Sequence, residues 1–316
     1  MTRTTFVPMP ALRLAPIVLF AFSRPDHTRR TLEALAANPL ASDSTLIVYA
    51  DAASTPQQTL GVQAVRAILR QVTGFAEVSV IERASNFGLA RNIIEGVTET
   101  LHKHQHVIVL EDDMVTSPWF LTYMNEALQH YANDERVVSI HGYVYPVSES
   151  LPETFFLPGA DCWGWATWRR GWACFNPDGL ALRTELKRRR LEYTFDFGDA
   201  YPYTEMLEAQ IAGTNDSWAI RWYASAFLAE KLTLYPGRSL VHNIGNDASG
   251  THCEQSSTMD AALSNKPVKL GCIEVRGDKQ ARDVIARFFS QQRKSGLWQR
   301  LRSWAGALVT RKSAIR

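Results

Sequence analysis

The chain has 316 residues, of which 46% are hydrophobic, 21% charged and 10% aromatic, as in an ordinary globular protein. This composition excludes a disordered or collagen-like chain and a scaffold held together by many disulfides. The net charge of +2 is unevenly distributed, because residues 287–316 contain eight basic and no acidic residues and the first 286 residues carry a net charge of −6. An acidic body disfavours a nucleic-acid partner, which would require basic residues over the binding surface.

The longest early apolar run, residues 15–22, is far shorter than the roughly 20 apolar residues that cross a bilayer. We interpret this run as a buried strand and not as part of a secretory signal, because Ser23-Arg24-Pro25 follows where a cleavage site would be needed. The four cysteines form no Cys-x-x-Cys pair, which is typical of a reducing compartment and offers no zinc framework. We therefore expect a cytoplasmic protein in which residues 1–14 are an N-terminal extension.

Apolar, β-branched runs alternate with helical periodicity through the first 140 residues. Strands are predicted at 17–22, 44–50, 78–81 and 107–110, and helices at 25–37, 58–71 and 89–102. This alternation predicts a doubly wound parallel sheet covered on both faces, whose ligands bind beyond the carboxyl ends of the strands. No Gly-x-Gly-x-x-Gly fingerprint and no Walker loop occurs in the sequence.

The second part of the chain has short strands, loops and helices that are rich in Trp and Tyr. A strand is expected at 137–141, helices at 180–191, 203–211 and 218–229, and the start of a coil at 233–236. Four tryptophans lie within residues 155–172. An aromatic region beside a ligand-binding sheet is a suitable place to hold a second substrate.

Three consecutive carboxylates, Glu111, Asp112 and Asp113, follow the apolar strand at 107–110. Because side chains alternate along a strand, we expect Glu111 and Asp113 on one side and Asp112 on the other. Such closely packed carboxylates repel one another unless a cation is present, and Mg²⁺ or Mn²⁺ commonly uses one or two carboxylates together with substrate phosphates. A second interpretation stays open, in which the aspartates only cap a helix that begins near Ser117.

The segment 110–120, Leu-Glu-Asp-Asp-Met-Val-Thr-Ser-Pro-Trp-Phe, resembles the metal-site segment of GT-A fold glycosyltransferases. It is most similar to the inverting N-acetylglucosaminyltransferase I family, and the likeness extends over most of residues 15–253. Residues 16–25 resemble that family's opening strand and arginine turn, and residues 155–165 resemble its Phe-x-Pro-Gly-x-Gly-Trp stretch. Residues 86–92, Asn-Phe-Gly-Leu-Ala-Arg-Asn, are closer to family-2-like bacterial glycosyltransferases, whose Asn-x-Gly loop contacts the nucleotide.

The resemblance implies roles for individual residues. Asp113 is implied to bind Mn²⁺ or Mg²⁺, and Asp216 to be the catalytic base. The family has Trp-Asp-Asp-Trp where this chain has Asn-Asp-Ser-Trp, so its base aligns with either Asp216 or Ser217; serine cannot act as a base unaided, and Glu205 and Glu208 remain alternatives. His252 is preferred to His242 as the histidine that closes over the donor. The residues implied to bind the donor are Arg24, Asp51, Asn86, Arg91, Glu111, Asp112 and His252.

The resemblance also implies an α/β fold of the GT-A type with a doubly wound, mostly parallel sheet. Residues 15–140 would form the nucleotide-sugar-binding half, and residues 141–285 the acceptor-binding and catalytic half of the same domain. The implied activity is metal-dependent transfer of a hexosyl or N-acetylhexosaminyl unit, with inversion, from a nucleoside diphosphate sugar such as a UDP-sugar to a glycan or lipid-linked acceptor. A non-catalytic protein that binds sugar or nucleotide on the same fold is the alternative.

Residues 286–316 form a basic C-terminal tail. Its apolar residues recur at helical spacing and include Trp298 and Trp304, while its charges are all positive. A basic amphipathic helix of this kind is suited to the interface of an anionic membrane, which would make the protein peripheral on the inner face of the cell membrane. Packing of the tail on the acidic body is an equally open alternative.

Overall fold

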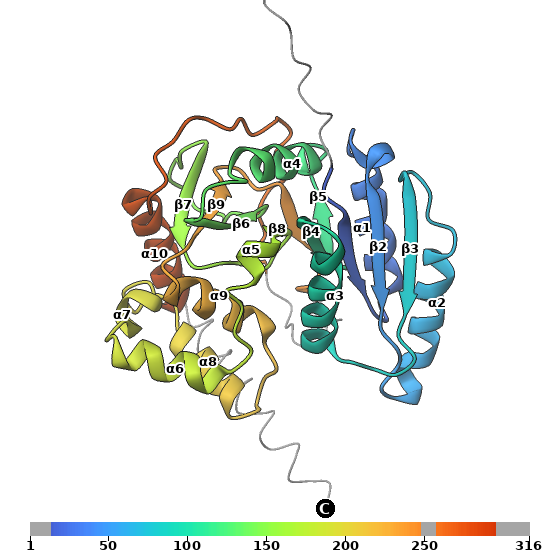
Figure 1. Ribbon diagram of the computed structural model, residues 1–316, viewed down its shortest axis with the longest axis horizontal. Helices are drawn as coiled ribbons and strands as arrows, with labels where there is room; N and C mark the ends of the chain where they lie inside the picture. The colour runs from blue at the N-terminus through green and yellow to red at the C-terminus, as the bar shows by residue number, and fades with distance from the viewer. Residues whose placement is uncertain (1–13, 248–256, 295–316) are drawn as a thin grey trace, which may run out of the picture.

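The computed structural model describes residues 14–247 and 257–294. Its central sheet has the strand order β3-β2-β1-β4-β8-β6-β9-β7 (Figure 1). The first four strands in the chain all pair in parallel, as the sequence predicted. They are β1 (Ile17–Ala21), β2 (Thr45–Ala50), β3 (Glu77–Glu82) and β4 (His106–Glu111).

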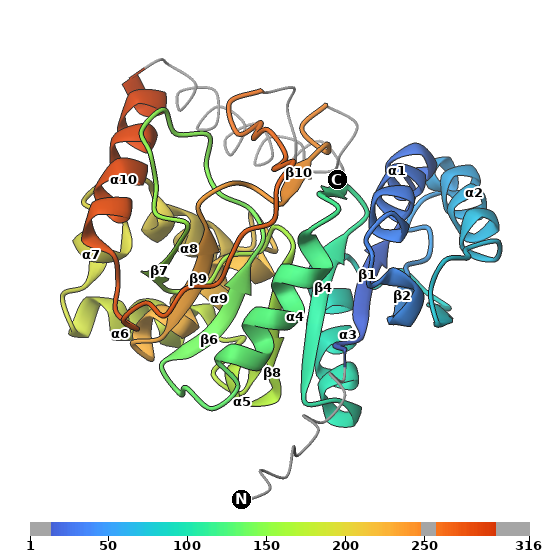
Figure 2. The ribbon, with the colours of Figure 1, turned by 90° about the horizontal axis from the view of Figure 1, so that it is seen from above.

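Helices cover both faces of this parallel part (Figure 2). Alternate residues of β1 explain why, because Ile17 and Leu19 pack into one hydrophobic cluster and Val18 and Phe20 into another. Helices α1, α2 and α4 pack on the first cluster, and α3 packs on the second. The helices and 3-10 turns of this half are α1 (Pro25–Ala36), η1 (Ala41–Asp43), η2 (Pro56–Gln58), α2 (Thr59–Leu69), α3 (Leu89–Lys103) and α4 (Phe120–His130).

The second half of the chain extends the same sheet beyond β4. Strand β8 (Trp165–Trp168) lies antiparallel between β4 and β6 (Val137–His141), which makes the sheet mixed. Strand β9 (Leu232–Pro236) is parallel to β6, and β7 (Thr154–Pro158) pairs antiparallel with β9 at the edge. The expectation that a coil begins at 233–236 is wrong, because β6 and β7 supply backbone partners on both sides of this short segment.

In the described residues, six helices accompany these strands, and several of those on the left of Figure 1 contribute residues to one hydrophobic cluster. Their bounds are α5 (Arg169–Trp172), α6 (Gly179–Arg188), α7 (Glu192–Phe195), α8 (Tyr203–Ile211), α9 (Trp218–Leu228) and α10 (Lys279–Lys294). Helix α6 ends before the predicted Leu191, and Arg190 has a positive φ of 55°. Helix α10 was not predicted, and it runs through the predicted boundary between the catalytic half and the tail.

Most tryptophans of the second half belong to the core. Trp165 and Trp222 are fully buried, and Trp165 also stacks on Trp218 at a centroid distance of 5.5 Å. Trp168 and Trp172 are buried as well, whereas Trp163 is only half-buried. Trp165, Trp172 and Trp222 share one cluster with α3, whereas Trp168 lies in the cluster on the other face, where its Nε1 donates to the backbone oxygen of Leu128 on α4. The buried rings therefore have packing roles, and the binding of a second substrate by this region stays a prediction.

A small antiparallel pair, β5 (Met114–Thr116) and β10 (Val241–Asn243), follows the three carboxylates. Strand β5 separates the two aspartates from α4, which begins only at Phe120. The aspartates therefore do not cap that helix, and the capping interpretation is wrong. The pairing also brings the segment after β10 against the carboxyl end of β4. Within the described residues, no helix is long and apolar enough to span a membrane. His252 and residues 295–316 of the predicted tail lie outside the described residues.

Candidate active site

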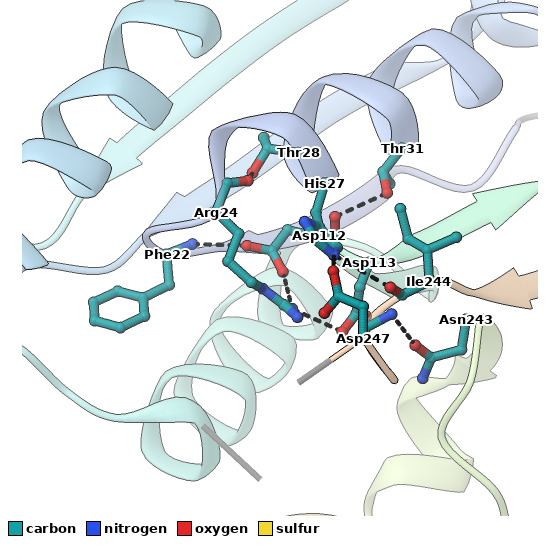
Figure 3. Close-up of polar contacts among 11 residues, drawn as sticks. Phe22, Arg24, His27, Thr28, Thr31, Asp112, Asp113, Asn243, Ile244 and Asp247 are labelled. Carbon is teal, nitrogen blue, oxygen red and sulfur yellow. Dashed lines mark hydrogen bonds and ion pairs between the residues drawn. The ribbon is translucent and has the colours of Figure 1, made fainter. Parts of the chain in front are cut away.

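The carboxylates after β4 share one arginine. Nη2 of Arg24, the residue just before α1, lies 2.6 Å from Oδ1 of Asp112 and 2.7 Å from Oδ2 of Asp113 (Figure 3). The backbone N–H of Phe22 donates to the other oxygen of Asp112 at 3.2 Å. The predicted alternation is wrong for the two aspartates, because the chain leaves the extended conformation at Asp112 and both side chains reach the same guanidinium.

Charge and burial act against each other at this turn. Burial acts to lower the pKa of Arg24, but Asp112 and Asp113 outweigh it and raise that pKa above its ordinary range. Burial, followed by the charges of Asp113 and Asp112, raises the pKa of Glu111 to about 8. Burial also raises the pKa of Asp112, although Arg24 opposes this. The acidic turn thus holds more negative charge than one guanidinium neutralises, and it favours a further cation.

The segment after β10 packs directly on the turn. The N–H of Ile244 donates to the backbone oxygen of Asp113 at 2.9 Å, and a Cβ at Gly245 would clash with the Asp113 carboxylate. His27 on α1 holds the same segment through Asp247, at 3.1 Å (Figure 3). Gly245 is therefore required by close approach, and sequence reasoning missed it; the glycine-rich character of this coil was the available signal.

One oxygen of the acidic turn has no partner among the described residues. Oδ1 of Asp113 is buried and makes no hydrogen bond to any of them. An acceptor-only oxygen of this kind suits Mg²⁺ or Mn²⁺, which take one or two carboxylates and complete their shell with water and phosphate. The described residues contain no group of three or more His, Cys, Asp or Glu side chains that could hold a metal by themselves. The donor set therefore fits a cation that is shared with a phosphorylated ligand.

Asp51 and Asn86 come together at the carboxyl ends of β2 and β3. The Asp51 carboxylate is buried and accepts from the N–H groups of Phe87 at 2.9 Å and Gly88 at 3.0 Å, and from Nδ2 of Asn86 at 3.2 Å. Gly88 has a φ of 72°, which favours glycine in this turn. Asp51 thus ties two loops together, and its contact with the donor stays a prediction.

Two arginines flank the ring of Phe87. The guanidinium of Arg91, a predicted donor residue, lies 3.9 Å from the ring centroid and pairs with Glu95 at 2.7 Å. Arg83 lies 4.5 Å from the same centroid and was missed by sequence reasoning. The available signal was its place immediately after β3, at the edge where the other candidate residues gather.

Asp216 lies in the loop before α9 and has a largely exposed side chain. Arg221 pairs with it at 3.2 Å. Ser217 is the N-cap of α9, since its side chain accepts from the N–H of Ile220, so Asp216 does not cap this helix. Trp218 stacks on Trp165, which pairs in register with Val109 of β4. Asp216 therefore stands at the end of α9 that faces the carboxyl end of β4.

The other predicted residues are more distant from the turn or have structural contacts. Glu208 pairs with Arg183 of α6 at 2.8 Å, and Glu205 lies in the first turn of α8. Nδ1 of His242 on β10 lies 3.2 Å from the backbone oxygen of Ala261. Asp161, in the loop between β7 and β8, was missed although it stands inside the recognised Pro-Gly stretch; Tyr145 donates to it at 2.9 Å.

Comparisons with known proteins give little beyond this geometry. No protein-family model matches the sequence, and no curated protein is significantly similar to it. Among solved structures, the chain is similar to a mannosyltransferase, PcManGT from Pyrobaculum calidifontis, determined in complex with GDP-Man and Mn²⁺. The sequence identity is 13% and the TM-score 0.34, with 59% of this chain and 50% of that protein covered. The match thus spans about half of that protein's length.

Proposed function

We propose that this protein is a metal-dependent glycosyltransferase that takes a nucleoside diphosphate sugar as its donor. The observation that carries the proposal is the acidic turn, where Arg24 bridges Asp112 and Asp113 and one buried carboxylate oxygen of Asp113 has no partner in the part of the chain that the structure describes. A site at the carboxyl edge of a parallel sheet, with a carboxylate for a divalent cation and an arginine beside it, suits a diphosphate.

Glycosyl transfer breaks the bond between the sugar carbon and the diphosphate oxygen, so negative charge develops on the leaving group. Asp113 would hold the divalent cation, with Asp112 as the second available carboxylate; when bound, the cation neutralises charge on the diphosphate. The guanidinium of Arg24 would turn toward the same phosphates and stabilise their negative charge. Its ion pair with Asp112 holds the arginine at the site. The close backbone at Gly245 limits the space for water beside this pair.

The acceptor hydroxyl must lose a proton as it attacks. Asp216 is the proposed base, because it is a carboxylate with solvent access on the side of α9 that faces the end of β4. Arg221 pairs with this carboxylate at 3.2 Å. Inversion of configuration, a UDP-sugar donor, a hexosyl or N-acetylhexosaminyl unit, and a glycan or lipid-linked acceptor reached from a membrane surface belong to the same proposal.

A panel of nucleoside diphosphate sugars tests this function. Each compound is first screened for an increase in melting temperature with and without Mn²⁺, because a ligand that binds only the folded state raises it. Hydrolysis of the stabilising donors is then followed by release of the nucleoside diphosphate. We expect a donor whose binding and turnover both require the metal. Stabilisation without any turnover would favour the non-catalytic binding protein, and no stabilisation by any donor would contradict the proposal.

A further inference from the structure

A polar and aromatic cluster lies at the same edge of the sheet as the acidic turn. Trp165, at the start of β8, pairs with Val109 of β4 on one side and with His141, the last residue of β6, on the other. The loop that precedes β8 and carries Asp161 therefore stands at the carboxyl ends of β4 and β6. Two strand spacings, about 10 Å, separate β4 from β6, so the acidic turn and this cluster lie near one another at the same edge of the sheet.

Asp161 is the centre of the cluster. Its Oδ2 accepts from the hydroxyl of Tyr145 at 2.9 Å and of Tyr235 at 3.4 Å, and its Oδ1 accepts from the N–H of Cys162 at 2.8 Å. An ionised carboxylate offers about four acceptor positions, so these three bonds leave capacity for a further donor. The Asp161 side chain is 22% exposed, which gives a ligand access to it.

The loop around Asp161 is held rigidly. Gly159 and Gly164 flank it with φ values of 89° and 63°, and a Cβ at Gly159 would clash with Tyr223. The N–H of Trp163 donates to Nε2 of His141 at 3.1 Å, which fixes the loop to the end of β6. The carboxylate is thus placed by the fold and is not left to the movement of an open loop.

Aromatic rings stand beside this carboxylate. Trp163 packs against Tyr143 at a centroid distance of 4.7 Å, and Tyr143 packs against Tyr145 at 5.4 Å. Tyr143 is buried, but Trp163 and Tyr145 are only half-buried and retain exposed surface. Burial, followed by the charges of Asp161, Glu111 and Asp113, raises the pKa of the Cys162 thiol. Cys162 is therefore close enough to both Asp161 and the acidic turn for their charges to act on it.

We propose that Asp161, Tyr145 and Trp163 form a binding subsite for a sugar ring, with the carboxylate accepting hydrogen bonds from sugar hydroxyls. Such a ring presents apolar C–H faces and vicinal hydroxyls, and a few placed polar groups among aromatic side chains match both. That this ring belongs to the acceptor rests on the proposed function. The binding of a sugar at this subsite does not rest on the proposed function, so it can be tested without donor turnover.

The test uses the full chain saturated with UDP or GDP, so that the donor subsite is filled. Methyl glycosides of glucose, galactose, mannose and N-acetylglucosamine serve as probes in saturation-transfer NMR and titration of tryptophan fluorescence. We expect at least one glycoside to bind, and Asp161→Asn to weaken it by about tenfold or more, because a charged acceptor is lost without a change of shape. Trp163→Leu should weaken it too, and it keeps the test decisive should Asp161→Asn fail to fold.

Asp178→Asn is the matched control. It makes the same chemical change at the exposed N-cap of α6, where asparagine caps as well as aspartate does, and should bind like the wild type. Absence of binding of every glycoside to the wild type, or unchanged binding to Asp161→Asn and Trp163→Leu, would overturn the subsite. Glycoside binding without turnover of any donor would leave the subsite standing and contradict the proposed function instead.

Discussion

Nη2 of Arg24 lies 2.7 Å from Oδ2 of Asp113, while the second oxygen of the same carboxylate is buried and makes no hydrogen bond within residues 14–247 and 257–294. The guanidinium also pairs with Asp112 at 2.6 Å, so its single positive charge is shared between two carboxylates. Buried carboxylate oxygens without partners are costly, and a bound cation removes that cost. This relationship links the stability of the site to its occupancy, and the first two predictions follow from it.

Asp113→Asn should abolish metal-stimulated donor turnover. An amide is a far weaker ligand for a divalent cation, and loss of one group that stabilises developing charge typically costs about 100-fold or more in rate. The side chain is only 9% exposed, so we expect some loss of stability rather than none. Donor hydrolysis is measured against Mn²⁺ concentration, with Asp178→Asn as the control for the loss of a carboxylate. Near-normal activity of Asp113→Asn in Mn²⁺ would contradict the metal site.

Arg24→Gln should destabilise the protein when no metal is present. Removal of one partner from a buried ion pair leaves charge uncompensated and costs about 3 kcal/mol. A divalent cation can replace that charge, so Mn²⁺ should raise the melting temperature of this variant more than that of the wild type. Melting curves in EDTA and in Mn²⁺ check both statements. An equal effect of Mn²⁺ on the two proteins would show that the cation does not bind beside Arg24.

Much of the parallel part of this fold was predictable because its signals are local. The strand that ends in Glu111 is a continuous apolar run, and the carboxylates follow it directly. The doubly wound arrangement places such residues at one edge of the sheet. Arg24 and Asp113 were therefore correctly brought to the same edge, although each was considered from its own segment.

The rest depends on pairing between distant segments. The β5–β10 pair brings Gly245 onto the turn; the glycine-rich coil hints at a close approach, but nothing in the sequence names Asp113 as the partner. The tyrosine partners of Asp161 are likewise distant in the sequence, since Tyr145 lies in the loop after β6 and Tyr235 in β9. Burial of Trp165 was also not predictable, because a tryptophan suits a core as well as a binding surface.

Asp51→Ala should lower stability and nucleotide binding together. The carboxylate accepts from the N–H groups of Phe87 and Gly88, so its loss leaves donors of the turn unpaired and costs about 2 kcal/mol. The affinity for UDP and GDP should fall because the loops after β2 and β3 are no longer tied together. Calorimetric titration and denaturant unfolding measure the two effects. Unchanged affinity in a destabilised variant would assign Asp51 a purely structural role.

His141→Gln should reduce the acid sensitivity of the fold. Burial lowers the pKa of His141, against the opposing effect of Asp161. This histidine therefore binds a proton more readily in the unfolded chain than in the folded protein. The free energy of unfolding falls as the pH drops below the ordinary histidine pKa of about 6.5, by up to about 1.4 kcal/mol per pH unit. Glutamine can still accept from Trp163 but does not titrate. Unfolding curves across this pH range should be flatter for the variant; parallel curves would contradict the assignment.

Asp216→Asn should reduce turnover by several orders of magnitude while leaving the melting temperature almost unchanged. The side chain is 73% exposed, so its contact with Arg221 contributes little to stability. The amide cannot accept a proton, whereas donor binding at the acidic turn is not altered by the change. The rate of transfer and the affinity for the donor are measured separately, because loss of a base lowers the first and spares the second.

Ser217→Ala is the matched control for this last prediction. It removes the N-cap of α9 and should cost about 1 kcal/mol of stability, but it leaves the carboxylate of Asp216 in place. A large fall in activity in Ser217→Ala would show that the position of α9, and not the basicity of Asp216, limits the rate. Full activity of Asp216→Asn would exclude it as the base and direct attention to the two alternatives, Glu205 and Glu208.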